Sequence, residues 1–455
     1  MIRGAINPLD GRYFEKTRAL APYFSEEALM AYRVMVECEF FIFLSASQTT
    51  GLRKLKSGEI KKVRALHKNF SNKSYNRIKA LEKITNHDVK AVEYFIKESL
   101  KKTSLKNVLE WVHFGLTSED VNNCAYGLML SLSLQNVISP ELLKIQNSLR
   151  SYAKTYKSLP MLARTHGQVA SPTTLGKEFA VFVSRLNRQR EMLKQYRVGV
   201  KLNGATGNYN ALVAAYPKVN WLSFTKNFVN YLNRICRANL RANLVTTQIE
   251  PHDTYAELSD NLRRINTVLL DLSQDIWRYI SDGYIGQKPK TGETGSSTMP
   301  HKINPIDFEN SEGNLGLANA LFEFFSHKLP ISRLQRDLSD STVERALGTA
   351  FGHSYLAYTS LLQGLGKMEI NKNKIIDDLQ AHPEVIAEAI QTILRREEAE
   401  LPYEKLKALT RGKTVTMEDF EKFIDGLSVS SKVKKELKKI TPSSYTGIAS
   451  KIAVL

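Results

Sequence analysis

Cysteine is scarce in this chain of 455 residues, which contains only Cys38, Cys124 and Cys236. The three lie far apart, with neither a CxxC pair nor the Cys/His spacing of a metal site. We therefore expect no metal. Isolated cysteines of this kind are usually small buried hydrophobic residues, and a reducing, cytoplasmic setting fits them.

Long apolar runs are also missing. The start, MIRGAINPLDGRY, has no apolar core region, so we expect no signal peptide. The longest uncharged stretch, residues 121–140, contains several serines and the amides of Asn122, Asn123, Gln135 and Asn136. These polar residues favour a buried helix over a membrane span. Neither a convincing set of alternating strands nor a repeat of solenoid period is visible.

Positive charge is abundant, because Lys and Arg outnumber Asp and Glu by 64 to 46 and give a formal charge of +18. Such a surplus indicates a nucleic-acid partner, an anionic substrate or simply a basic surface. The basic residues are spread along the chain. In the densest cluster they alternate with apolar residues, as on the solvent-facing side of a helix: Lys434, Lys435, Lys438 and Lys439. The charge alone therefore decides little, and a basic, helical nucleic-acid-binding protein stays open as an alternative.

Helical periodicity dominates the pattern of apolar residues. One stripe steps by three and four residues from Leu142 through Ile145 and Leu149 to Tyr156, and Pro160 ends it. A second extends over more than six turns: Leu258, Leu262, Ile265, Leu269, Leu272, Ile276 and Ile280. Stripes this long and narrow are typical of helices packed along other long helices in a bundle. At this length we expect two or three domains and a mostly α fold.

Polar, glycine-bearing segments separate the predicted helices, and the most informative ends in GSSTMPHKINP, residues 295–305. Gly286, Gly292 and Gly295 favour mobility, and Asn304 with Pro305 fits the N-cap and first turn of a helix. The glycine spacing excludes a phosphate-binding P-loop. Two interpretations remain, a lid over an anionic substrate and a polar surface loop.

Two histidines stand in polar surroundings. His166 in RTHGQ lies beside a glycine at the expected mouth of a helix, where it can reach solvent or substrate. His87 lies in TNHD, where Thr85 and Asp88 also fit a capping box. Most histidines are not catalytic, so a structural or surface role stays open for both.

Two further segments, residues 117–120 and 341–344, each place an acid three residues after a hydroxyl, as in a capping box. They either only start helices or also hold a carboxylate or phosphate at a helix N-terminus. Arg336 and Arg345 flank the second segment and favour anion binding there.

Taken together, these segments resemble the fumarase/aspartase superfamily, whose signature is Gly-Ser-Ser-x-Met-Pro-x-Lys-x-Asn-Pro. Every fixed position of that signature is present in residues 295–305. Within the superfamily the chain resembles the bacterial type of adenylosuccinate lyases, over nearly its whole length. The motifs that carry this likeness are TNHDVKAVEYF, FGLTSEDVNN, ARTHGQ, TTQIEPHD, GSSTMPHKINPIDFENSEGN and RDLSDSTVER.

The resemblance implies a three-domain subunit: a helical domain at 1–111, a long-helix bundle at 112–364 bearing the signature loop 286–305, and a helical domain at 365–455. It implies release of fumarate from two substrates of purine biosynthesis, adenylosuccinate and the succinylated aminoimidazole carboxamide ribotide (SAICAR). It further implies a homotetramer with active sites shared between subunits, no cofactor, and neither a nucleic-acid nor a membrane partner. Another fumarate-releasing lyase, such as one acting on argininosuccinate, is the alternative within the superfamily.

The resemblance also implies the site residues. Ser296 would be the general base and His166 the general acid, and His87 would assist His166 or only bind substrate. The implied substrate-binding residues are Arg12, Tyr13, Asn86, His87, Asp88, Thr117, Ser118, Gln248, Ser297, Lys302, Asn304, Asn310, Arg336, Ser341, Thr342 and Arg345.

Overall fold

The computed structural model describes residues 4–289, 292, 299, 301–412 and 414–455. Interleaved segments of the chain form two compact units. Unit 1 comprises Met1–Leu142, Gln189–Thr267 and Gly313–Thr359, and unit 2 comprises Leu143–Arg188, Val268–Glu312 and Ser360–Leu455. The long helices that continue from one unit into the other are α8 (Ser139–Thr155), α9 (Leu175–Gln195), α12 (Asp253–Ser281), α13 (Ile306–Lys328) and α15 (Leu347–Lys367).

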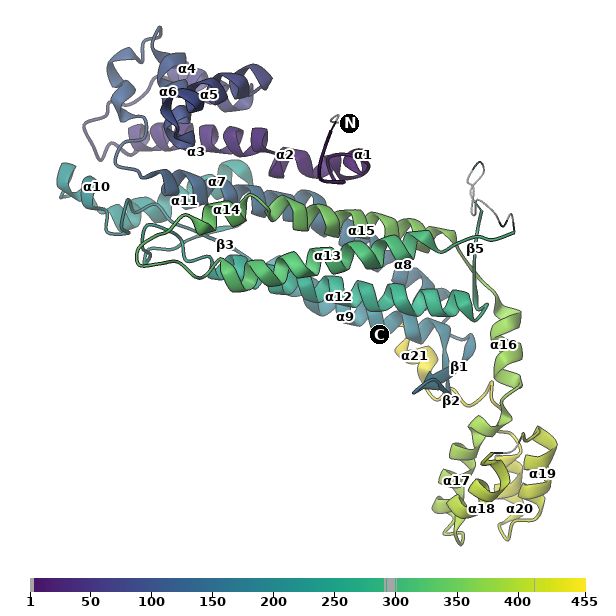
Figure 1. Cartoon of the computed structure of the whole chain (residues 1–455). Helices are drawn as coiled ribbons and strands as arrows, with labels where there is room; N and C mark the ends of the chain where they lie inside the picture. Colours follow the sequence, from purple (N-terminus) through teal and green to yellow (C-terminus); the bar gives the residue numbers. More distant parts are fainter. Residues whose placement is uncertain (1–3, 290–291, 293–298, 300, 413) are drawn as a thin grey trace. The chain divides into compact units, whose positions relative to one another are not determined.

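The N-terminal part of unit 1 is built around α3, which is buried along most of its length. Ser25 caps this helix, because its hydroxyl accepts a hydrogen bond from the Ala28 N–H at 3.1 Å. Helices α4, α5 and α6 gather beside α3 (Figure 1). The elements here are α1 (Phe14–Thr17), η1 (Arg18–Leu20), α2 (Ala21–Phe24), α3 (Glu26–Ser47), α4 (Ser57–Lys68), α5 (Asn72–Thr85), α6 (Asp88–Leu100) and η2 (Lys106–Trp111).

In the rest of unit 1, a parallel strand pair lies directly on α7. A Cβ atom at Gly127 of α7 would come within 2.6 Å of Val200 Cγ1, so this glycine permits the close approach. The elements are α7 (Ser118–Ser133), the π-helical turn η3 (Leu134–Ile138), β3 (Val198–Val200), α10 (Asn210–Ala215), α11 (Trp221–Cys236), β4 (Leu240–Ala242) and α14 (Ser339–Glu344).

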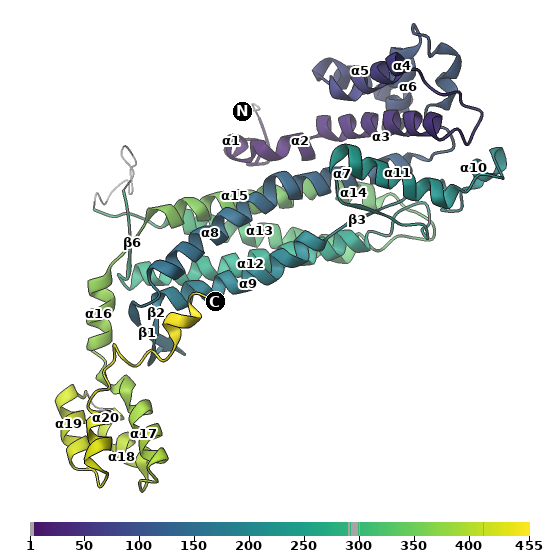
Figure 2. The same ribbon diagram turned by 180° about the vertical axis from the view of Figure 1, so that it is seen from behind.

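Unit 2 contains an antiparallel hairpin of β1 (Pro160–Thr165) and β2 (Gln168–Thr174), and a second antiparallel pair of β5 (Ile285–Gln287) and β6 (Met368–Ile370). Helices α17–α20 form a small cluster, and α21 lies beside the hairpin (Figure 2). Leu162 of β1 joins the apolar core of these helices. The helices are α16 (Lys372–Gln380), η4 (Pro383–Ile386), α17 (Ala387–Arg396), α18 (Pro402–Thr410), α19 (Met417–Asp425), α20 (Ser431–Leu437) and α21 (Ala449–Ile452).

The predicted helical stripes are confirmed. Leu142, Ile145 and Leu149 are buried on α8, and all the predicted α12 residues from Leu258 to Ile276 are buried as well. The uncharged stretch at 121–140 forms the buried helix α7 and its π-helical continuation, as predicted. Among the described residues, no helix has the length and apolar character needed to cross a membrane. In α20, Val433 and Leu437 point inward and the lysines lie outside them, as predicted.

The mostly α fold is confirmed, and the described residues also include three short strand pairs that no alternating pattern in the sequence indicated. The hairpin escaped the sequence pattern since its first strand buries the consecutive residues Met161 and Leu162, where β1 departs from regular register. Alternation between polar and apolar residues, on which the prediction relied, is therefore broken there.

Candidate active site

A cleft of about 850 Å³ in unit 1 is lined mainly by polar side chains. Its walls come from the junction of α5 and α6, the start of α7, the loop at 205–206, Gln248 and the segment 334–345. Nine predicted substrate-binding residues line this cleft together: Asn86, His87, Asp88, Thr117, Ser118, Gln248, Arg336, Ser341 and Arg345.

The junction of α5 and α6 brings His87 to the cleft wall. Asn86 ends α5 in the left-handed region at φ 48°, and His87 is the N-cap of α6. Its Nδ1 accepts a hydrogen bond from the Lys90 N–H at 3.2 Å. The neutral ring therefore carries its proton on Nε2, 3.5 Å from the Ser118 hydroxyl. The predicted capping box of Thr85 and Asp88 is wrong, because Thr85 still belongs to α5.

The start of α7 faces the same cleft. Asp120 accepts a hydrogen bond from the Thr117 N–H at 2.9 Å, so the predicted capping box at 117–120 is confirmed. The N-termini of α6 and α7 thus both lie at the cleft. Helix N-termini carry unpaired N–H groups and partial positive charge, so this arrangement favours an anionic ligand.

The predicted capping box at 341–344 is wrong. Helix α14 already begins at Ser339, whose N–H donates to Asp337 Oδ1 at 2.7 Å. Ser341 consequently lies inside α14, where it still lines the cleft. Thr342 is exposed on the same helix and lies outside the lining.

Asp88 holds two arginines, of which Arg345 lines the cleft and Arg33 is buried. Its Oδ2 lies 2.8 Å from Arg33 Nη2 and 3.2 Å from Arg345 Nη2. Burial acts to raise the pKa of Asp88, but the positive charge of Arg33 and a hydrogen bond from the Val89 N–H outweigh it, so the pKa is lowered. Asp88 is therefore a carboxylate that orients cations. Arg33 was not predicted, because it lies in the apolar helix α3 with no neighbouring motif.

Arg336 is the second cationic group of the cleft wall. Its Nη1 lies 3.0 Å from Glu119 Oε2 and donates to Gln248 Oε1 at 3.3 Å. Its Nη2 lies 3.9 Å from Asp340 Oδ1. The guanidinium is thereby fixed from behind by acids, and Gln248 is linked to it.

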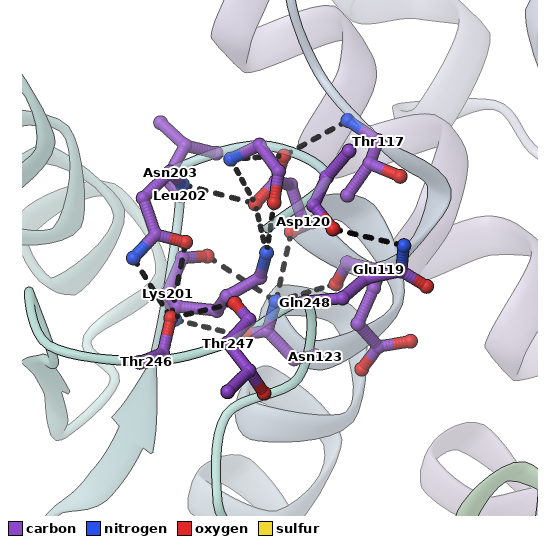
Figure 3. A network of polar contacts seen from close by, with 12 residues as sticks. Thr117, Glu119, Asp120, Asn123, Lys201, Leu202, Asn203, Thr246, Thr247 and Gln248 are labelled. Atoms are coloured by element: carbon purple, nitrogen blue, oxygen red, sulfur yellow. Dashed lines mark hydrogen bonds and ion pairs between the residues drawn. The ribbon is translucent and has the colours of Figure 1, made fainter. Parts of the chain in front are cut away.

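A buried network joins three walls of the cleft (Figure 3). Lys201, which is fully buried, places its Nζ 2.9 Å from Asp120 Oδ1 and 2.8 Å from the Gly204 carbonyl oxygen. Asp120 also accepts the N–H groups of Asn203 and Gly204 at 3.0 and 3.1 Å. The network thus ties the start of α7 to the loop that presents residues 205–206 to the cleft.

Arg12 and Tyr13 also belong to unit 1. Tyr13 precedes α1, and the exposed Arg12 lies with its guanidinium carbon 5.9 Å from the centre of the Tyr13 ring. Neither residue belongs to the lining of the cleft. Their predicted role in substrate binding stays a prediction.

His166 lies in unit 2, at the tip of the β1–β2 hairpin rather than at the mouth of a helix, so that expectation is wrong. Thr165 pairs with Gln168, and between them His166 and Gly167 have φ of 54° and 74°. Two central residues with positive φ define the type I′ turn that joins tightly paired strands. The turn leaves His166 exposed.

The signature loop also belongs to unit 2. Ser296 and Ser297 lie outside the described residues. Lys302 is exposed, and its N–H donates to the Met299 carbonyl oxygen at 3.0 Å. Asn304 directly precedes Pro305, and α13 begins at Ile306 as the sequence predicted within one residue. Asn310 on α13 accepts a hydrogen bond from Ser360 at 2.8 Å.

One group of buried side chains has metal-like spacing. The ligand atoms of Glu119, His252 and Asp340 all lie within 4.8 Å of one another. Arg336 already supplies a cation to this group, and His252 Nε2 lies 3.3 Å from Glu344 Oε1. No metal-ligand spacing in the sequence indicates this group, although Glu119, His252 and Asp340 lie in the motifs FGLTSEDVNN, TTQIEPHD and RDLSDSTVER.

The fold and the anion-favouring cleft agree with the comparisons to known proteins. Residues 11–319 match the family described as Lyase. A fumarate lyase from Mesorhizobium sp. BNC1 has the same fold, with a TM-score of 0.73 and 17% identity over 96% of each chain. A helical lyase is therefore the class that the fold and the family match define.

More specific matches cover nearly the whole chain. Residues 332–446 match the family described as Adenylosuccinate lyase C-terminal. The adenylosuccinate lyase of Legionella pneumophila (strain Corby) is 51% identical over 98% of this chain and 97% of its own. The enzyme of the same name from Escherichia coli (strain K12) is 47% identical over the same shares. The chain belongs to the adenylosuccinate lyase family.

Proposed function

We propose that this chain cleaves adenylosuccinate into AMP and fumarate, and SAICAR into the aminoimidazole carboxamide ribotide (AICAR) and fumarate, as a step of purine nucleotide biosynthesis. Membership of the adenylosuccinate lyase family supports this substrate class. The structural observation that carries the proposal is the cleft in unit 1, where two arginines and two helix N-termini converge.

The cleft chemistry suits the charge of the proposed substrates. Each carries a phosphate and two carboxylates, so several cationic and donor groups must converge on it. Arg336 and Arg345 provide guanidinium groups that can bind carboxylate or phosphate through two parallel hydrogen bonds. Ser118, Ser341 and the Nε2–H of His87 provide neutral donors on the same walls. In this form His87 binds substrate as a donor.

The proposed reaction is an elimination. A base removes the proton from the carbon next to one carboxylate, the carbon–nitrogen bond breaks, and an acid protonates the departing nitrogen. We assign the base to Ser296 and the acid to His166, since histidine is the side chain best suited to proton transfer near neutrality. Serine is a poor base in water, so Lys302 and backbone N–H groups must stabilise its alkoxide in a closed site. The scheme uses neither a metal nor a nucleotide cofactor.

We further propose a homotetramer whose subunits share their active sites. Nine of the predicted residues line a cleft in unit 1, while His166, Lys302 and the remainder of the signature loop belong to unit 2. Contributions from neighbouring subunits would complete each site. The three-domain division at residues 111 and 364 is part of the same proposal. A cytoplasmic location is supported by the three cysteines, which are all unpaired.

A fumarate-release assay tests the proposed function. Purified protein is incubated with adenylosuccinate, SAICAR or argininosuccinate, and fumarate is followed by its absorbance while AMP and AICAR are followed by chromatography. We expect turnover of the first two substrates and none of argininosuccinate. Absence of fumarate from both purine substrates would reject the proposal.

Single substitutions test the assigned roles. We expect His166→Ala and Ser296→Ala each to lose most of the rate, since proton transfer by one group contributes roughly 10²- to 10⁴-fold. Folding and assembly should be unchanged by circular dichroism and light scattering. Near-normal turnover of either variant would remove that residue from its role.

A further inference from the structure

Behind the cleft wall lies a buried charge cluster of Glu119, His252, Asp340 and Glu344, grouped around Arg336. The exposed fractions of the first four residues are 1%, 0%, 2% and 2%. Charged groups are almost never fully buried unless they are paired. The cluster has no place in the elimination chemistry proposed above, and its position next to Arg336 therefore calls for a role.

The cluster contains nearly equal numbers of negative and positive groups. Three carboxylates face two cationic groups, Arg336 and protonated His252. Burial acts to lower the pKa of His252, but Glu344 outweighs it and raises the pKa to about 9. Burial and then the charge of Glu344 raise the pKa of Glu119 to about 7. His252 thus holds its proton at neutral pH, and Glu119 is the member whose charge changes there.

Glu119 also makes the shortest contact between this cluster and the Arg336 guanidinium. Its Oε2 lies 3.0 Å from Arg336 Nη1 and accepts a hydrogen bond from Asn122 Nδ2 at 3.4 Å. Arg336 and Asn122 both line the cleft. Its other oxygen, Oε1, is buried and has no hydrogen-bond partner among the described residues. One carboxylate therefore holds two lining side chains from behind.

We propose that Glu119 is a positioning residue, which fixes the Arg336 guanidinium on the cleft wall so that its outer face meets an anionic group of the substrate. This proposal rests on the proposed function for the identity of that substrate. Holding a long side chain in its binding geometry removes the entropy cost of ordering it when ligand arrives. The His252–Glu344 pair and Asp340 complete the support from behind.

The substitution Glu119→Gln tests the proposal, because it keeps the shape and the hydrogen bonds but removes the charge. We expect the KM for adenylosuccinate to rise about tenfold, the size expected for one weakened charge-assisted hydrogen bond. We expect kcat to change less than about threefold, since binding of substrate and transition state would weaken together. A merely structural defect would instead lower the amount of folded enzyme and leave KM unchanged.

Glu39→Gln is the matched control. Glu39 is also a buried carboxylate of unit 1, held by Arg64 at 3.0 Å and His67 at 3.1 Å. Neither it nor its partners line the cleft. Glu39→Gln should affect folding about as much as Glu119→Gln does. Its KM should equal that of the parent enzyme.

The pH profile gives a second readout. The charged groups that face Glu119 are Glu344, Arg336, His252 and Asp340. Protonated Glu119 resembles glutamine, so the KM of the parent enzyme should rise as pH falls through about 7. The KM of Glu119→Gln should lack this component. Titration of the substrate itself is common to both proteins and cancels in their ratio.

Binding of AMP and of fumarate, measured by calorimetry on the full protein, separates this proposal from the proposed function. About tenfold weaker binding of either ligand to Glu119→Gln supports the positioning role, even if the parent enzyme fails to release fumarate. Unchanged affinity for both ligands together with an unchanged KM would overturn it, whatever the outcome of the activity assay.

Discussion

The buried pair of Asp120 and Lys201 makes the most quantitative prediction. Removing one partner of a buried ion pair typically costs about 3–5 kcal/mol, because the other charge stays buried without compensation. In this structure, removing Lys201 and removing Asp120 should reduce the unfolding free energy by different amounts. In Lys201→Met the Asp120 carboxylate keeps three backbone N–H donors, from Thr117, Asn203 and Gly204. We therefore expect a loss near the lower limit, about 3 kcal/mol of unfolding free energy.

Asp120→Asn should cost more, about 5 kcal/mol. The Lys201 ammonium would keep the Gly204 carbonyl oxygen but lose the carboxylate that neutralises its charge. The amide nitrogen of the new asparagine would also point its N–H groups at backbone N–H donors whose hydrogen bonds the Asp120 carboxylate now accepts. The double variant should lose less than the sum of the two single losses, since it leaves no unpaired buried charge.

Guanidinium chloride unfolding measures these losses. Of the three tryptophans, Trp111 and Trp221 lie in unit 1 and Trp277 lies in unit 2. A Trp277→Phe background therefore makes fluorescence a reporter of unit 1 alone. Arg77→Met is the control, because Arg77 and its partner Glu98 are both exposed, at 45% and 52%, and its loss should cost no more than about 1 kcal/mol.

Asp120→Asn should be less stable than Lys201→Met, and the double variant should fall short of additivity. Equal losses in the two single variants would show that the three backbone N–H donors do not sustain the lone carboxylate. Strict additivity in the double variant would show that the two side chains do not interact. Either result would refute the roles of Asp120 and Lys201 in the network of Figure 3.

Three further outcomes are expected. Gly176→Ala should lower the thermal midpoint of unit 2 and cost about 3 kcal/mol, because the new Cβ would lie 2.5 Å from the Lys157 backbone nitrogen; an unchanged melting curve would contradict this. Because the pKa of His252 is raised to about 9, its contribution to stability is full below about pH 6.5 and is lost as pH rises through 9. In His252→Gln the denaturation midpoint should therefore change less with pH over that range than in the parent enzyme. Curves of midpoint against pH that run parallel for the two proteins would contradict this. Mixing inactive His166→Ala and Arg345→Ala enzymes should restore part of the fumarate release if sites are shared, whereas no recovery after verified subunit exchange would confine each site to one chain.

Much of the helical fold could be predicted, because its signal is local. The α12 stripe from Leu258 to Ile276 keeps one face apolar over many turns, and a pattern of that length has few alternative explanations. The hairpin at 160–174 could not be predicted in the same way. Its strands are short, and its turn uses His-Gly in place of the Asn-Gly pair that usually marks such turns.

The candidate site was predictable only in part. Residues of the cleft stand in recognisable motifs, and nine of them do lie together. What the motifs cannot give is the support behind them. Arg33 reaches Asp88 from a helix 55 positions earlier in the chain, and Glu344 meets His252 from 92 positions later. Contacts at such separations leave no periodicity, so only the folded structure reveals which acid neutralises which base.

The two-residue turn at the hairpin tip limits which amino acids position 166 can accept. A left-handed backbone there suits glycine, asparagine and aspartate and penalises alanine and β-branched residues. A saturation library ranked by thermal midpoint should therefore place that small set and histidine highest, whereas a screen for growth without external purines should retain histidine only. His166→Asn consequently makes a cleaner chemical knockout than alanine, since it respects the loop geometry while removing the transferable proton.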